Sequence, residues 1–341
     1  MMRILRWGPP HTTREIMQAV WIALVPGTLT SLWVFGSGVL VNICLTAVGA
    51  LLAEWLGQRL RGCATKPALQ DGSTLLTAWL LGLALPPVAP LWLPLVGGMI
   101  AIGCGKQLYG GLGQNPLNPA MLAYAILLIG APVAMTTGWA VPFQHAPTVT
   151  VQAWLHGMTA DGVTGATVLD LYRTTFEVLT APEIALHPMF EGGGFGIAPG
   201  VAWVALSHVV GGIYLLSRRV IRWQAPVGVL VGLLGLAAFF GIDPDNQVPV
   251  LTHALAGATI FAALFIVTDP VSGATSPRGQ WWFGVGVGVI TYLIRTYGLY
   301  PDGIAFAVLI MNFCVPWIDQ YTRPRIHGEV HAIRGTGRGR L

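Results

Sequence analysis

Charged side chains are scarce in this sequence. Only 9% of its 341 residues are Asp, Glu, Lys or Arg, whereas ordinary soluble domains carry about 25%. So little charge excludes the pair of soluble domains that a chain of this length would otherwise suggest. Apolar residues make up 54% of the chain and glycines number 44, and glycine is frequent in transmembrane helices. We therefore predict an all-α polytopic membrane protein.

Paired cysteines and a cleavable secretion signal are also missing. The four cysteines are far apart and form no C-x-x-C pair, which argues against a zinc or iron–sulfur site made by this chain alone. The first 14 residues are polar and basic, unlike a signal peptide. The net charge is +4, but the basic residues lie in connections between apolar segments. We therefore expect contact with membrane lipid and no nucleic-acid partner.

Ten apolar segments are candidates for membrane spans, with about 20 residues as the length of a spanning helix. Five precede a long polar interval at 136–199 and five follow it: 16–35, 39–56, 74–85, 91–108, 119–135, 201–216, 226–240, 250–268, 282–294 and 303–318. The third and ninth are short, which suggests tilted, broken or extended helices. The predicted organisation is a first five-helix half (1–135), an extracytoplasmic loop (136–199), a second five-helix half (200–320) and a basic tail (321–341).

If there are ten spans, the lysines and arginines of the connections lie mostly on one side of the membrane. They precede the first span, follow the second, sixth, eighth and tenth, and end the fourth, whereas Arg295 is the only basic residue near the opposite connections. Basic residues favour the cytoplasmic side. Both termini are therefore predicted to be cytoplasmic, with the loop at 136–199 facing outward. Its five acidic residues against a single Arg173 agree with that placement.

An odd number of spans in each half implies that the halves, if related, are inverted in the membrane. LLTAWLLGLALPP in the third span resembles ATIFAALFIVTDP in the eighth, and glycine and proline precede both the fifth and the tenth. Inverted repeats with interrupted segments at matching positions point to a ligand site between the repeats. Two inverted repeats suit a solute channel or secondary transporter equally well, so that function remains an alternative.

The segment NPLNP at 115–119 contains two candidate ligand-binding residues, Asn115 and Asn118. Asn118 is a natural N-cap, and Pro119 suits the first helical position. The free N–H groups of such a helix start attract anionic or carbonyl oxygens. The alternative is a helix start without a ligand.

Three carboxylates at the ends of spans are candidates for an ion route: Asp71, Asp269 and Asp302. Carboxylates inside a membrane are costly and often functional, although an aspartate at the headgroup boundary is the simpler reading. Lys106 and Arg295 border apolar spans and are candidates for snorkelling. Lys106 is also a candidate cofactor-binding residue.

The outward loop contains the motif Asp161-Gly162-Val163-Thr164-Gly165-Ala166-Thr167. Its Asp-Gly and Thr-Gly pairs favour turns, which would present Thr167 on a ledge of small residues. The motif matches no acid–base pair, phosphate-binding loop or nucleophilic triad. By itself it is a weak functional signal.

Over almost its full length the chain resembles the RnfD/NqrB family of membrane subunits. The resemblance rests on residues 71–77, on KQLYGGLGQNPLNPA at 106–120, on the loop motif, and on residues 268–271, 300–308 and 322–325. The short polar head is more similar to RnfD than to NqrB. The resemblance implies a subunit, not catalytic alone, of a bacterial inner-membrane ferredoxin:NAD⁺ oxidoreductase that moves Na⁺ or H⁺. The other Rnf subunits would be its partners.

The resemblance also implies a covalent flavin. In this family the last threonine of the loop motif carries FMN through a phosphoester bond that a separate flavin transferase installs. Here that residue is Thr167, and the rest of the cofactor-binding motif is Asp161, Thr164, Gly165 and Ala166. A noncovalent riboflavin is a further possibility. Residues 269–275 (DPVSGAT) fit the same loose pattern, but Thr275 is predicted to face the cytoplasm, so Thr167 is favoured.

Overall fold

The computed structural model describes residues 12–143, 164–176, 178–193, 197–241, 245 and 247–323, so Asp161 of the loop motif lies outside the described residues. Within these ranges the chain is helical and contains no β-strand, apart from one isolated bridge between Ala140 and Thr164. The all-α prediction is confirmed for this part of the chain.

Helices occupy every one of the ten predicted intervals. The first half comprises α1 (Thr13–Phe35), α2 (Gly38–Leu60), α3 (Thr65–Gln70), α4 (Ser73–Ala84), α5 (Trp92–Ile102), the π-helical turn η1 (Gly103–Gln107), α6 (Pro119–Gly130) and α7 (Pro132–Thr137). The second half comprises α11 (Pro199–Ser217), α12 (Gln224–Phe240), α13 (Val250–Leu255), α14 (Thr259–Phe261), the π-helical turn η4 (Ala262–Ile266), α15 (Pro277–Tyr297) and α16 (Ile304–Thr322).

Four of these helices are long and apolar enough to cross a membrane by length and composition, namely α1, α2, α11 and α16. Three shorter apolar helices, α4, α6 and α12, accompany them. These helices support a membrane-embedded protein, and a crossing by the remaining predicted spans stays a prediction.

Two predicted continuous spans are wrong in detail. The fifth is interrupted at Ala131, between α6 and α7, because Pro132 lacks an N–H group and disfavours helical geometry in the residue before it. The eighth is interrupted between α13 and α14, where Gly257 adopts a positive φ of 65°. Of the short third and ninth spans, expected to be tilted, broken or extended, the ninth is extended by α15 to 21 residues. The third coincides with the short helix α4, which Gly72, with a φ of 84°, separates from α3.

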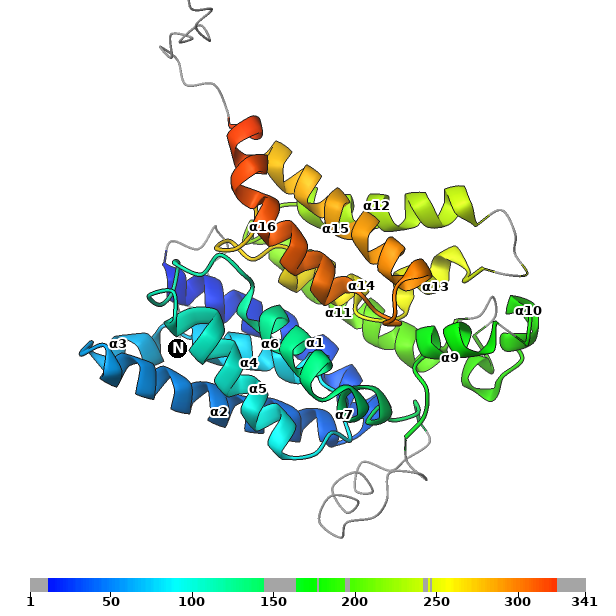
Figure 1. Ribbon diagram of the computed structural model, residues 1–341, viewed down its shortest axis with the longest axis horizontal. Helices are drawn as coiled ribbons and strands as arrows, with labels where there is room; N and C mark the ends of the chain where they lie inside the picture. Colours follow the sequence, from blue (N-terminus) through cyan, green and yellow to red (C-terminus); the bar gives the residue numbers. More distant parts are fainter. Residues whose placement is uncertain are drawn as a thin grey trace, which may run out of the picture.

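The two halves pack against each other along two pairs of helices. Helix α1 contacts α11, and α6 contacts α16; Figure 1 shows α1–α6 in blue to green on one side and α11–α16 in green to red on the other. Small residues permit close backbone approach: a methyl group at Gly211 of α11 would lie 2.0 Å from the carbonyl oxygen of Ala23 in α1. Close packing of small residues is the usual way in which helices associate in a membrane.

The loop between the halves has its own small hydrophobic core. It contains α9 (Val168–Thr175), α10 (Ala181–Ile184) and the 3₁₀ turn η3 (Pro188–Phe190), which lie together at one end of the molecule (Figure 1). The core is formed by Val168, Leu169, Tyr172, Ala181, Ile184, Phe190, Ala198 and Ala256. Since Ala256 lies in the break after α13, this core joins the loop to the second half.

Candidate functional site

An apolar cavity of about 200 Å³ lies where the two halves meet the loop. Helices of both halves line it, among them α1, α4, α6, α11, α14 and the start of α16, together with the loop and the connecting segments beside these helices. The aromatic lining residues are Phe35, Tyr124, Trp139, Phe261 and Tyr300. A mostly apolar wall with a few polar groups is typical of a small-molecule site.

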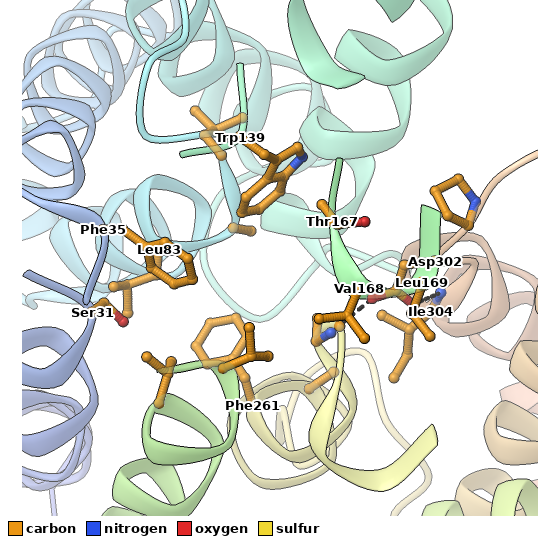
Figure 2. A pocket seen from close by; sticks show the side chains of 18 of the residues that line it. Ser31, Phe35, Leu83, Trp139, Thr167, Val168, Leu169, Phe261, Asp302 and Ile304 are labelled. Atoms are coloured by element: carbon orange, nitrogen blue, oxygen red, sulfur yellow. Dashed lines mark hydrogen bonds between the residues drawn. The ribbon is translucent and has the colours of Figure 1, made fainter. Parts of the chain in front are cut away.

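Thr167 is one of those few polar groups. Figure 2 shows it on the cavity wall between Trp139 and Asp302. It is half-buried and is the N-cap residue of α9, where its Oγ1 accepts a hydrogen bond from the amide of Asp170 at 3.2 Å. The sequence placed Thr167 in a turn, and the structure adds that this turn starts a helix. A hydroxyl at a helix start lies beside N–H groups that have no partner within the helix.

The residues before Thr167 dock on the end of the first half. The amide of Gly165 donates to the carbonyl oxygen of Trp139 at 2.9 Å, next to the bridge between Ala140 and Thr164. A Cβ at Gly165 would lie 2.5 Å from Cγ2 of Val141. Close contact with this side chain therefore explains why a glycine stands two residues before Thr167.

The residues after Thr167 dock on the second half. Leu169 contacts Gly257, where an added Cβ would lie 2.9 Å from its Cδ1. Arg173 donates through Nη2 to the carbonyl oxygen of Gly298, just after α15. Burial raises the pKa of the Tyr172 phenol, and a hydrogen bond to Thr252 partly offsets that effect. The loop motif is thus held between both halves of the protein.

Asp302 lines the same cavity and belongs to a buried ion pair. Its Oδ1 lies 3.0 Å from Nη2 of Arg295, and its Oδ2 accepts from the amide of Ala258 at 2.7 Å. The side chain of Arg295 is 2% exposed. It is thus buried in the protein and does not snorkel.

Lys106 is buried in a second ion pair, away from the cavity. Its Nζ lies 3.1 Å from Oε2 of Glu54, 2.9 Å from Oγ of Ser73 and 3.1 Å from Oγ1 of Thr74. The side chains of Lys106 and Glu54 are 4% and 0% exposed. These contacts replace the predicted snorkelling of Lys106.

Asn118 caps α6 as predicted, with its Oδ1 accepting from the amides of Ala120 and Met121 at 3.1 and 3.2 Å. The backbone N–H of Asn118 donates to Oδ1 of Asn312 in α16, and this bond links the two halves. The Nδ2 of Asn312 donates in turn to the carbonyl oxygen of Ser272. Asn118 therefore both caps α6 and connects the two halves.

The remaining predicted residues have local partners. Asn115 donates to the carbonyl oxygen of Leu117, and Asp71 accepts from the amide and hydroxyl of Ser73. Asp269 accepts from Ser272 and, across the two halves, from Nδ2 of Asn118 at 3.5 Å, so the structure brings these two predicted residues together. Among the described residues, the cavity lining includes Ala166, Thr167 and Asp302 of the predicted site. It does not include Asp71, Lys106, Asn115, Asn118, Thr164, Gly165 or Asp269.

Sequence reasoning missed Glu54 and the part that Trp139 plays. Glu54 is a single carboxylate in the apolar run ALLAEWLG, and a charge at such a place implies a buried partner. Lys106 is the matching charge, so two isolated opposite charges in apolar segments were a usable signal. Nothing in the sequence marks Trp139 as the residue whose carbonyl receives the loop motif.

Comparison with known proteins gives one family model and several relatives of the same name. Residues 7–328 match the model of the NQR2, RnfD, RnfE family. A protein of Pseudomonas aeruginosa, named as a subunit of the ion-translocating oxidoreductase complex, is 46% identical over 343 residues, covering 98% of each chain. Proteins of the same name from Aeromonas hydrophila and Yersinia enterocolitica are 46% and 43% identical, covering 93% and 94% of this chain and 95% of each relative. The chain therefore belongs to the NQR2, RnfD, RnfE family.

Proposed function

We propose that this protein is the flavin-carrying membrane subunit of an ion-translocating ferredoxin:NAD⁺ electron-transfer complex, coupled to Na⁺ or H⁺. FMN is attached to Thr167 through a phosphoester bond. The relatives share a name that makes them part of an ion-translocating oxidoreductase complex, which supports a place for this chain in such a complex. The other subunits of the complex are then the electron donors and acceptors for this chain.

The observation that carries this proposal is the position of the Thr167 hydroxyl. It lies at the start of the eight-residue helix α9 and on the wall of an aromatic-lined cavity. A phosphate on Oγ1 would meet the positive end of the helix dipole and its free N–H groups. The apolar, aromatic wall suits a flat ring system.

The residues around Thr167 therefore fit a phosphoester-linked flavin. Bound FMN supplies the redox chemistry, while the chain binds and orients it. Gly165 and the carbonyl of Trp139 hold the attachment point against the first half, and Leu169 and Arg173 hold it against the second. A noncovalent riboflavin elsewhere in the chain stays an expectation from the family resemblance.

The rival threonine has less suitable surroundings. The hydroxyl of Thr275 donates to Oδ2 of Asp319 at 3.0 Å, and its amide donates to Oδ1 of the same carboxylate. A phosphate at Thr275 would face this negative charge at short distance. These contacts favour Thr167 as the modified residue.

A ten-span arrangement with inverted halves accompanies this function. Three correspondences between the halves support it. The first and fifth helices of one half pack against those of the other, as α1–α11 and α6–α16. Gly72 and Gly257 lie at breaks in matching positions, and each half buries one basic side chain in an ion pair, Lys106 in the first and Arg295 in the second. Both termini then lie in the cytoplasm of a bacterial cell, and a flavin transferase reaches Thr167 from the outer side. A reporter active only in the cytoplasm should work when fused after Arg61 or Arg222 and fail when fused within 140–160. Activity of the loop fusion would overturn this topology.

The attachment site is tested by producing the chain together with a flavin transferase. We expect a fluorescent band on a denaturing gel that Thr167→Ala abolishes. Thr275→Ala serves as the matched motif control, and Thr174→Ala, an exposed threonine on the same helix α9, serves as the local control. Both controls should keep the band. A band that survives Thr167→Ala would disprove the assignment, and a colourless wild-type chain would favour a solute transporter.

A further inference from the structure

The break between α13 and α14 surrounds a buried cation with oxygen atoms. That cation is the guanidinium of Arg295, which reaches the break from α15. Its Nη1 donates to the carbonyl oxygen of His253 at 2.9 Å. Its Nη2 donates to Oγ1 of Thr259 at 2.9 Å and to Oδ1 of Asp302 at 3.0 Å.

Each of these three oxygens is held in place by groups other than Arg295. The Thr259 hydroxyl donates to the carbonyl oxygen of His253 at 2.8 Å, so its lone pairs are free to face the cation. The Asp302 carboxylate accepts from the amides of Ala258 and Ile304 at 2.7 and 3.3 Å. The carbonyl of His253 belongs to α13, which stops at Leu255. The oxygen set is therefore built by the chain around the break and not by the arginine.

Gly257 makes this arrangement possible. It has a φ of 65°, and an added Cβ would lie 2.5 Å from Oδ2 of Asp302 and 2.9 Å from Nη2 of Arg295. Unwound backbone that presents carbonyl oxygens is how broken membrane helices coordinate monovalent cations. Here one carbonyl oxygen at the break, that of His253, faces a side-chain cation.

The first half repeats the design at the break between α3 and α4. The three hydrogens of the Lys106 ammonium match three acceptors, namely Oγ of Ser73, Oγ1 of Thr74 and Oε2 of Glu54. The two hydroxyls direct their own hydrogens to Asp71 and Glu54, so both present lone pairs to the ammonium. Two independent breaks that each hold a cation from the chain argue against a chance contact.

We propose that the break between α13 and α14 is a monovalent-cation site that the tethered guanidinium of Arg295 occupies permanently. Arginine stays protonated in proteins and cannot leave. The site therefore fixes the broken helix and the Asp302 wall of the cavity, and it takes no part in binding a transported ion. This inference rests on the contacts of Arg295 and not on the proposed flavin.

The test removes the tether and supplies a free cation. Arg295→Ala is purified as the full chain in detergent, and its Tm is followed in millimolar guanidinium chloride, with choline chloride at equal ionic strength as the salt control. We expect the Tm to rise and saturate with guanidinium in this variant, because a ligand of the folded state stabilises it by mass action. Wild type and Arg278→Ala, which removes an exposed arginine from the other end of α15, should show no such rise. A folded Arg295→Ala chain without a guanidinium response overturns the proposal, whereas a response to NaCl as well extends the site to alkali cations.

Three further variants keep the test decisive. Adding Asp302→Asn to Arg295→Ala should abolish the guanidinium response, because the carboxylate supplies the charge that attracts the cation. If Arg295→Ala does not fold, Arg295→Lys and Arg295→Gln are compared: a cation site requires a clearly higher Tm for the lysine variant. Equal values would mean that the side chain only fills space, which overturns the proposal. Flavin fluorescence at Thr167 is read separately on the same samples, so failure of the flavin assignment leaves this result standing.

Discussion

Removing one partner of the Lys106–Glu54 pair should destabilise the protein strongly. At 3.1 Å and an effective dielectric constant of about 20, the attraction between the two charges is about 5 kcal/mol. Lys106→Met keeps most of the side-chain volume but leaves Glu54, which is 0% exposed, with Thr74 and Gln58 as its remaining side-chain donors among the described residues. Breaking one side of a buried pair costs about 3–5 kcal/mol. We therefore expect a loss of that size.

The assay is thermal unfolding of the purified chain in detergent. At about 2 °C for each kcal/mol, a value typical of larger chains, the Tm of Lys106→Met should fall by roughly 6–10 °C. Arg59→Met is the control, because Arg59 is exposed and lies over the ring of Trp55. Its Tm should fall by no more than about 2 °C, since an exposed cation–π contact contributes less than about 1 kcal/mol.

The double variant Glu54→Leu/Lys106→Met tests the reasoning itself. If the loss comes from an unpaired buried charge, removing both charges should recover most of it, because apolar replacements of buried pairs are often neutral. Together with the single variant Glu54→Leu, these two variants form a double-mutant cycle, and the coupling should reach at least about 2 kcal/mol. Simple additivity of the two single losses would refute the view that the charges stabilise each other.

Three further results are expected. Gly165→Val should weaken flavin labelling of the loop on a denaturing gel, and Val141→Ala in the same chain should restore it, because the added side chain meets Cγ2 of Val141 at 2.5 Å. Hydrogen bonds from Thr180 lower the pKa of Glu183. The stabilisation of α10 is therefore present above the unfolded pKa and lost as pH falls through the folded one. The hydrogen-exchange protection factor of the Thr180 amide, which is corrected for the slower intrinsic exchange at low pH, should fall on acidification and lose that dependence in Glu183→Gln. Asn118→Ala should cost about 1–2 kcal/mol in thermal unfolding, since it removes the cap of α6; an unchanged Tm would contradict the capping role.

Local chemistry in the sequence correctly predicted the start of α6. Asn118 followed by Pro119 predicted the cap of α6, and the structure confirms it. Composition and apolar length predicted an all-helical membrane protein for the same reason, since both depend on short-range properties of the chain. The break at Gly257 could not be predicted, because this glycine resembles the many others that serve close helix packing. Its positive φ lies where it packs against Asp302 and Arg295, which are far along the chain.

The candidate site also combines features that the local sequence predicts with features that depend on tertiary contacts. A motif and a family resemblance were enough to nominate Thr167, but not to predict that it caps α9 beside a cavity. That cavity is made by helices from both halves, and no single segment carries its pattern. The pairing of Glu54 with Lys106 was also a tertiary property, although two isolated charges in apolar segments gave a hint of it.

The double docking of the loop motif has a consequence for the order of events in biosynthesis. Thr167 leaves the ribosome after the Trp139 side of its site but before Gly257, Arg295 and Asp302, which complete the other side. Under the proposed topology, the Thr167 hydroxyl would stay open on that side until the second half has been made. Under the proposed flavinylation, this interval would give the modifying enzyme its freest access to Thr167. Variants that slow insertion of the second half should lengthen this interval, whereas variants that speed its docking should shorten it.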